Sequence, residues 1–220
     1  MHYEAKAAHL GGNLSCLDIL MTLYHDVLKP EDVFILSKGH SAGALYVTLW
    51  SKGLLSDDDL KTFHGEGTSL PGHAPLGGGS LGHGLSIAAG VALGKKLQGQ
   101  PGRVYCLCSD GEMEEGQSWE AAMFAVHHRL DNLVFMVDGN QRQGYGPPRT
   151  GYAGIDDWLP VDGHNPDHIM KAATINTGSS RGVLFSTLKG RYVSFLEDRH
   201  ESHYTVLTHD QYEQAMKELV

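Results

Sequence analysis

Two short apolar segments, each followed by a polar side chain, constrain the fold most. Residues 103–108 and 133–137 are apolar runs of strand length, and a helix-like sequence separates them. This order predicts parallel neighbouring strands, whose carboxyl ends meet at one edge of a sheet. Further short strands are predicted at residues 33–36 and 183–187. We therefore expect an α/β fold in which a parallel sheet is covered by helices on both faces.

The segments between these strands predict helices. Expected helical segments are 1–28 with a break, 42–50, 57–63, 85–97, 117–129, 164–173 and 210–219. The break at residues 9–13 is expected to be a loop, with Asn13 or Ser15 as the helix cap. Residues 141–163, which contain several glycines and a Pro-Pro pair, are also expected to be a loop. Nothing resembling a linker divides the chain, so residues 1–220 are expected to form a single domain.

The composition excludes several classes of function. The 220 residues include 26 acidic and 17 basic side chains, a formal charge of −9, which gives no general attraction to nucleic acid or anionic membranes. No apolar run approaches the roughly 20 residues of a membrane helix. The first residues lack the basic-then-apolar order of a secretory signal. The 3 cysteines indicate no disulfide framework, so we expect a cytoplasmic protein.

Polar residues follow both of the apolar segments in the middle of the chain. Asp110 follows the first and Asn140 the second, and Gly111 would let the backbone approach an anion. A carboxylate and an amide carbonyl are hard oxygen donors that suit Mg²⁺, which completes its shell with phosphate oxygens and water. The Asp-Gly and Gly-Asn pairs are each also common turn signals, and alone neither indicates more than a turn. Together they predict a metal–diphosphate site.

The wider pattern resembles a known family. Residues 109–116 followed by Asn140 are similar to the Gly-Asp-Gly…Asn motif with which transketolases bind thiamine diphosphate. Other segments resemble this family in the same order: 9–15, 36–40, 72–73, 79–84, 162–164 and 193–197. The resemblance covers nearly the whole chain and is strongest to the N-terminal chain of split, two-chain transketolases.

This resemblance implies a binding site for thiamine diphosphate and Mg²⁺. The side chains of Asp110 and Asn140 would bind the metal, together with the backbone carbonyl of Arg142. His40 and Gly111 would contact the diphosphate.

It also implies roles for residues around the rest of the cofactor. Residues expected to line the cofactor pocket are Gly79, Ser80 and Leu81. Residues expected to face the reacting end of the cofactor and the substrate are His9, His73 and His203. Glu115 would lie near the subunit interface and couple the cofactor sites.

The sequence also departs from the family pattern. Ser109 replaces the first glycine of the motif, which is tolerable if that residue has a negative φ, and His83 replaces a glutamine. The stretches 73–79 and 140–162 are shorter than in usual members. These differences affect the loops that face the substrate, so the resemblance does not identify the donor or the acceptor.

The resemblance implies that this chain carries half of an active site. In transketolases the glutamate that activates the cofactor belongs to a second, pyrimidine-binding domain, for which 220 residues leave no room. We expect an α₂β₂ assembly with a transketolase-like C-terminal chain, which transfers a two-carbon ketol unit from a ketose phosphate. Three alternatives remain: transfer to a lipoyl group or acyl carrier protein, another class of thiamine diphosphate enzyme, and a non-catalytic cofactor-binding subunit.

Overall fold

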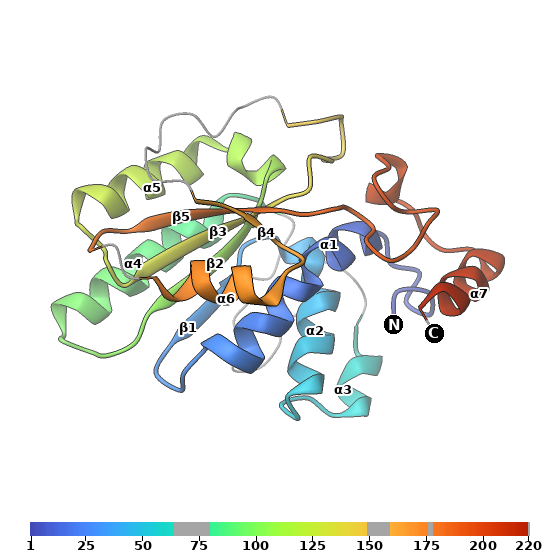
Figure 1. Cartoon of the computed structure of the whole chain (residues 1–220), viewed down its shortest axis with the longest axis horizontal. Coiled ribbons are helices and arrows are strands. Elements are labelled where there is room, and N and C mark those ends of the chain that lie inside the picture. The colour runs from blue at the N-terminus through green and yellow to red at the C-terminus, as the bar shows by residue number, and fades with distance from the viewer. Residues whose placement is uncertain (64–79, 149–158, 176–177, 220) are drawn as a thin grey trace.

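A five-stranded parallel sheet forms the centre of the molecule (Figure 1). The computed structural model describes residues 1–63, 80–148, 159–175 and 178–219. The strands, in the spatial order β1-β2-β3-β5-β4, are β1 (Val33–Leu36), β2 (Val104–Ser109), β3 (Leu133–Gly139), β5 (Arg181–Ser186) and β4 (Leu159–Asp162). Every residue of β2 and β3 is buried, as the two apolar runs predict. The prediction of a parallel sheet is confirmed.

Helices cover both faces of this sheet. They are α1 (Leu10–Thr22), α2 (Ala42–Ser51), α3 (Asp57–Lys61), α4 (His83–Leu97), α5 (Gly116–His127), α6 (Pro166–Thr174) and α7 (His209–Glu218). Tyr105 and Leu107 of β2 belong to a core shared with α1, α2 and α6, whereas Cys106 and Cys108 belong to a core shared with α4 and α5. This alternation is the period of a strand that is buried on both sides. The helix α7 lies beyond the end of the sheet, where Tyr212 stacks on Tyr3 (Figure 1).

The strand register aligns the ends of β2 and β3. Ser109 pairs with Asp138, so Asp110 and Asn140 both follow at the same edge of the sheet. Ser109 is the last residue of β2 and is not among the residues with positive φ, which explains why a serine is accepted at this position.

The expected loop at residues 9–13 is wrong. The helix α1 begins at Leu10, and both Asn13 and Ser15 lie inside it rather than capping it. The residue before the helix, His9, has the left-handed conformation with φ of 65°.

Close packing explains why two glycines begin a helix here. A Cβ atom on Gly11 would lie 2.7 Å from Oγ of Ser202, so only glycine fits without a shift. Asn13 joins α1 to α2, because its Oδ1 accepts a hydrogen bond of 2.7 Å from the backbone N–H of Ala44. Tertiary contacts therefore stabilise a helical turn that its own sequence disfavours.

The expected loop at residues 141–163 is wrong in one part. Its end forms β4, which pairs with β5 at the edge of the sheet. Pro160 fits an edge strand, where one side of the backbone needs no partner. Among the described residues, no helix is both long enough and apolar enough to cross a membrane.

Candidate cofactor site

A cavity of about 310 Å³ opens at the carboxyl edge of β2 and β3. Such an edge is where ligands bind in parallel α/β sheets. Its lining residues are His9, Gly12, His40, Leu81, Ser109, Asp110, Gly111, Asn140, Arg142, Gln143, Gly144, Tyr145, Lys189, His203 and Tyr204. Eight of the residues that we predicted from the sequence lie in this lining, although they come from segments far apart in the chain.

Asp110 is the only acidic side chain among the described residues that line the cavity. It is 2% exposed, and its two carboxylate oxygens accept hydrogen bonds from the backbone N–H groups of Gly111 at 2.8 Å and Gln141 at 2.6 Å. Burial, followed by the nearby charge of Asp138, raises the pKa of Asp110 to about 6. A bound cation at this carboxylate would counter both effects.

Asn140 is oriented by a buried carboxylate below it. Its Nδ2 donates to Oδ2 of Asp138 at 3.2 Å, so the amide oxygen is the atom left for a ligand. That oxygen accepts a 3.1 Å hydrogen bond from the backbone N–H of Arg142. Asp138 itself pairs with Lys38, and both side chains are fully buried. Burial opposes the charge of Asp138, but Lys38 outweighs it and lowers the pKa of this carboxyl.

Lys189 is a cavity residue that the sequence analysis missed. Its ammonium group donates to the backbone carbonyl of Arg142, the third predicted metal ligand, and to Nδ1 of His203 at 2.7 Å. Burial and then the charge of Lys38 lower the pKa of Lys189 to about 8. Its only sequence signal is the position just after the predicted strand 183–187, at the edge where ligands bind.

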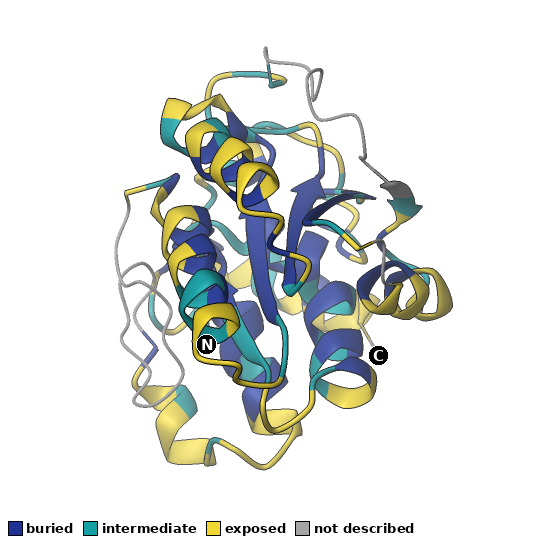
Figure 2. Cartoon of the chain, turned by 90° about the vertical axis from the view of Figure 1, so that its left-hand side faces the viewer, coloured by how far each residue is buried: buried dark blue, intermediate teal, exposed yellow. Residues whose placement is uncertain are grey.

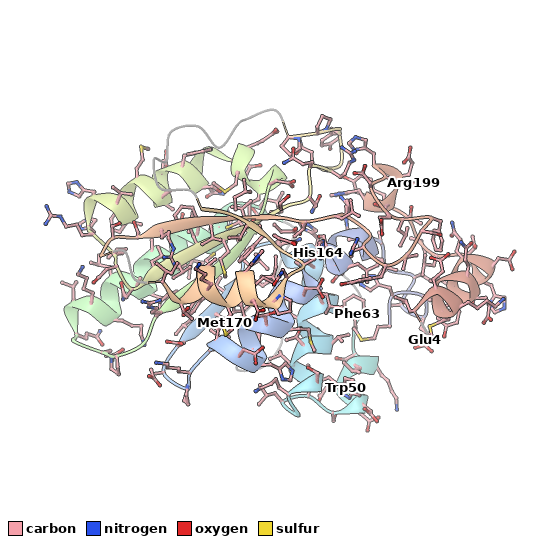
Figure 3. All side chains as sticks on the ribbon, in the orientation of Figure 1. Glu4, Trp50, Phe63, His164, Met170 and Arg199 are labelled. Atoms are coloured by element: carbon pink, nitrogen blue, oxygen red, sulfur yellow. The ribbon has the colours of Figure 1, made fainter. Side chains whose placement is uncertain are left out.

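The turn before Lys189 is held by His164, which lies near the middle of the molecule (Figure 3). Nδ1 of His164 lies 2.7 Å from Oδ2 of Asp18, and Nε2 accepts a 2.8 Å hydrogen bond from the backbone N–H of Leu188. The imidazole therefore fixes the backbone next to Lys189 from behind the cavity.

Three predicted histidines form one cluster. The ring centroids of His9 and His203 are 4.9 Å apart, those of His9 and His40 are 5.4 Å apart, and those of His40 and His203 are 6.0 Å apart. Burial is the largest cause that lowers the pKa of His40 well below its usual value and the pKa of His203 to about 3. Lys189 is the next cause for His203, which is therefore a neutral hydrogen-bond acceptor at pH 7.

The other predicted residues do not line the cavity. Ser80 is exposed, and its Oγ lies 3.2 Å from Nε2 of His83, the residue that replaces a family glutamine. Glu115 is exposed at the start of α5. His73 and Gly79 lie outside the described residues.

The lining fits a magnesium diphosphate group. The carboxylate of Asp110, the amide oxygen of Asn140 and the carbonyl of Arg142 are hard oxygen donors, and Mg²⁺ binds few protein ligands when phosphates supply the others. No group of three or more His, Cys, Asp or Glu that could hold a metal occurs among the described residues, which fits a site of that kind. Lys189 and the histidines lie where phosphate oxygens would need donors.

Comparison with known proteins identifies the family. Residues 2–147 match the family model described as "Transketolase, thiamine diphosphate binding domain". One of the two subunits named for the apulose-4-phosphate transketolase of Phocaeicola vulgatus is 36% identical, over 99% of this chain and 88% of that protein. The 6-deoxy-6-sulfo-D-fructose transketolase subunit SqwG of a Clostridium species is 37% identical, over 96% of this chain and 88% of that protein.

Solved structures agree with this assignment. Transketolase from Campylobacter jejuni superimposes with a TM-score of 0.78 and 27% identity, covering 96% of this chain and 39% of that one. Transketolase from Leishmania mexicana, at 22% identity, shares the fold with a TM-score of 0.83 and covers 97% of this chain. This chain thus spans about 39% of the length of such a transketolase. The chain belongs to the transketolase family, and its cavity is that of the family's thiamine diphosphate-binding domain.

Proposed function

We propose that this chain is the diphosphate- and Mg²⁺-binding subunit of a two-chain transketolase, in which residues 1–220 act as one cofactor domain. The observation that carries the proposal is the meeting of Asp110 and Asn140 at the edge of β2 and β3, within a cavity that suits a diphosphate. Two similar proteins named as transketolase subunits span nearly the same length, which supports a separate second subunit.

We assign the metal to Asp110, Asn140 and the carbonyl of Arg142. The raised pKa of Asp110 supports this, because a carboxylate short of positive charge gains most from a cation. His40 and Gly111 would then contact the diphosphate, and both line the cavity.

The substrate would lie against His9, His73 and His203. When bound, thiamine diphosphate supplies the electron sink for breaking a carbon–carbon bond of a ketose. His203 is neutral and accepts a hydrogen bond from Lys189 at Nδ1, so its Nε2 would be the atom offered to a substrate hydroxyl. The left-handed backbone of His9 supports a functional role, because such strain in a residue other than glycine is common at active sites.

The reaction would be transfer of a two-carbon ketol unit from a ketose phosphate to an acceptor. The similar proteins of Phocaeicola vulgatus and the Clostridium species are named for apulose 4-phosphate and 6-deoxy-6-sulfo-D-fructose, so related subunits act on different sugars. We propose a sugar phosphate as donor and an aldehyde sugar as acceptor.

The partner would be a C-terminal, pyrimidine-binding chain in an α₂β₂ assembly. The outer faces of α4 and α5 support this, since Ile87, Met123 and Val126 are 40%, 64% and 54% exposed on the side away from the sheet (Figure 2). Gly90 and Gly94 on α4 have open space around them, which leaves room for a close approach. Obligate interfaces of this kind bury about 2,000 Å² or more, and paired sites favour two-fold symmetry.

Binding of the cofactor tests the proposal. Thiamine diphosphate is titrated in the presence of Mg²⁺ into the wild-type chain, Asp110→Ala and the exposed control Asp131→Ala, each with the partner chain. We expect Asp110→Ala to weaken binding at least about a hundredfold, because diphosphate and buried polar groups lose their metal. Equal affinity in Asp110→Ala and wild type would refute the metal assignment. An assay with an aldose phosphate, a lipoyl domain and an acyl carrier protein as acceptors distinguishes the proposed acceptor from the other two.

A further inference from the structure

One buried carboxylate lies beside the cavity without lining it. Glu112 follows Gly111 directly, is 0% exposed and is absent from the residues that line the cavity. Burying a carboxylate is unfavourable unless hydrogen bonds compensate for the lost water. The partners of Glu112 therefore indicate what it does.

Three donors from three separate segments converge on this carboxylate. Oε1 accepts from the hydroxyl of Ser37 and, at 2.6 Å, from the backbone N–H of Gly82. Oε2 accepts from the backbone N–H of Ser109 at 3.2 Å. Ser37 follows β1, Gly82 precedes α4, and Ser109 ends β2.

Each donor is the chain neighbour of a residue at the site. Ser109 precedes Asp110, Gly82 follows Leu81, and both Asp110 and Leu81 line the cavity. Ser37 precedes Lys38, the partner of the buried Asp138.

The joint is tight as well as polar. Oγ of Ser37 also accepts a 3.0 Å hydrogen bond from the backbone N–H of Gly84. A Cβ atom on Gly84 would lie 2.7 Å from Cα of Ser37, so the two segments touch at their backbones. The three segments therefore have one arrangement, and Glu112 is the group they share.

We infer that Glu112 is a positioning residue, which holds the segments around residues 37, 82 and 109 in the arrangement that binds thiamine diphosphate and Mg²⁺. The inference rests on the proposed function, since it concerns the same cofactor. Glu112 acts through the backbone next to Asp110 and Leu81 and touches neither the cavity nor its contents.

Replacement of Glu112 by glutamine tests this role with little change of volume. An amide has one accepting oxygen, so its NH₂ group would face a backbone N–H of Ser109 or Gly82 and that donor would lose its partner. We expect the Kd of the chain and its partner for thiamine diphosphate to rise at least about tenfold, and the Mg²⁺ concentration for half-maximal binding to rise with it. Saturating cofactor and Mg²⁺ should restore most of the binding, because the ligands themselves are intact.

The matched control is Glu213→Gln, which neutralises an exposed glutamate on α7. It should bind like wild type. A purely structural role for Glu112 predicts a lower Tm with an unchanged Kd for the folded protein, and that result overturns the inference. If wild type binds no thiamine diphosphate, the proposed function fails instead.

Ser37→Ala provides a second test in case Glu112→Gln does not fold. It keeps the carboxylate but removes the hydroxyl that joins it to the segment after β1. We expect a rise in Kd of about threefold to tenfold, and an unchanged Kd in this variant contradicts the inference.

Discussion

Lys38 and Asp138 carry opposite charges in a place that excludes water completely. The carboxylate of Asp138 also accepts hydrogen bonds from Ser15, Thr187 and Asn140. Lys38 donates to the backbone carbonyl of Gly12 at 3.0 Å. The pair thus connects α1, β3 and the turn after β5 beneath the proposed metal site.

Asp138→Asn should therefore destabilise the protein strongly. The variant leaves the ammonium of Lys38 buried without a counter-charge, and breaking a buried pair typically costs about 3–5 kcal/mol. The free energy of unfolding, measured with urea, checks this. Asp131→Asn breaks the pair with Lys96, whose side chains are 48% and 40% exposed, and should cost less than about 1 kcal/mol. Similar losses in the two variants would contradict this account.

His203 should make the protein sensitive to acid. Its pKa is lowered from 6.5 to about 3, first by burial and then by Lys189, so the folded state binds fewer protons than the unfolded state between these pH values. Stability is therefore unaffected by this group above about pH 6.5 and falls as the pH drops below it. His203→Gln should reduce the loss of unfolding free energy between pH 7 and pH 5 by about 1 kcal/mol, after allowing for partial exposure. An equal loss in variant and wild type would count against the buried, neutral state of His203.

Single residues differ in how far the sequence could predict them. Asp110 and Asn140 were predictable because strand spacing alone brings them to one edge. Lys189 and Asp138 were not, since a lone lysine or aspartate has no periodic pattern and its partners come from distant segments. The buried partners of Glu112 likewise depend on packing that only the folded chain shows.

Two glycines of α4 should respond oppositely to alanine. Gly84 lies against Cα of Ser37, so Gly84→Ala forces backbone apart and should destabilise the chain by about 1–3 kcal/mol. Gly90 has open space around it and is inside the helix, so Gly90→Ala should stabilise the chain alone by about 0.4–1 kcal/mol. Thermal unfolding of the chain without its partner measures both. Destabilisation by Gly90→Ala would show that the side of α4 carrying Gly90 is already packed.

Whole elements were predictable where the apolar pattern is regular. The strands β1, β2, β3 and β5 and most helices lie within a few residues of their expected places. The start of α1 was not, because contacts of Gly11 with Ser202 outweigh the low helix propensity of glycine. The edge strand β4 was missed because it is four residues long, contains Pro160 and follows a glycine-rich stretch.

The exposed outer faces of α4 and α5 should mediate assembly. Met123 is 64% exposed on α5, so Met123→Glu should leave the Tm of the isolated chain nearly unchanged but weaken association with the partner at least about tenfold. Sedimentation or mass photometry of the mixed chains measures this. Leu54→Glu is a matched control, because Leu54 is 51% exposed after α2, on the helix layer of the opposite sheet face. Equal weakening by both variants would exclude α5 as the interface.

At the scale of the molecule, the cavity has the groups for a diphosphate but lacks a second carboxylate. Among the described residues of its lining, Asp110 is the only acid, and the proposed metal uses it. The glutamate that activates the cofactor in this family must then come from the partner chain. We expect the purified chain to show no ketol transfer above background, even with saturating thiamine diphosphate and Mg²⁺, and to become active on addition of the partner. Activity should rise with partner concentration and saturate at one partner per chain, as an α₂β₂ assembly requires. Substantial turnover by the chain alone, free of partner by mass spectrometry, would show that the active site is not shared between two chains.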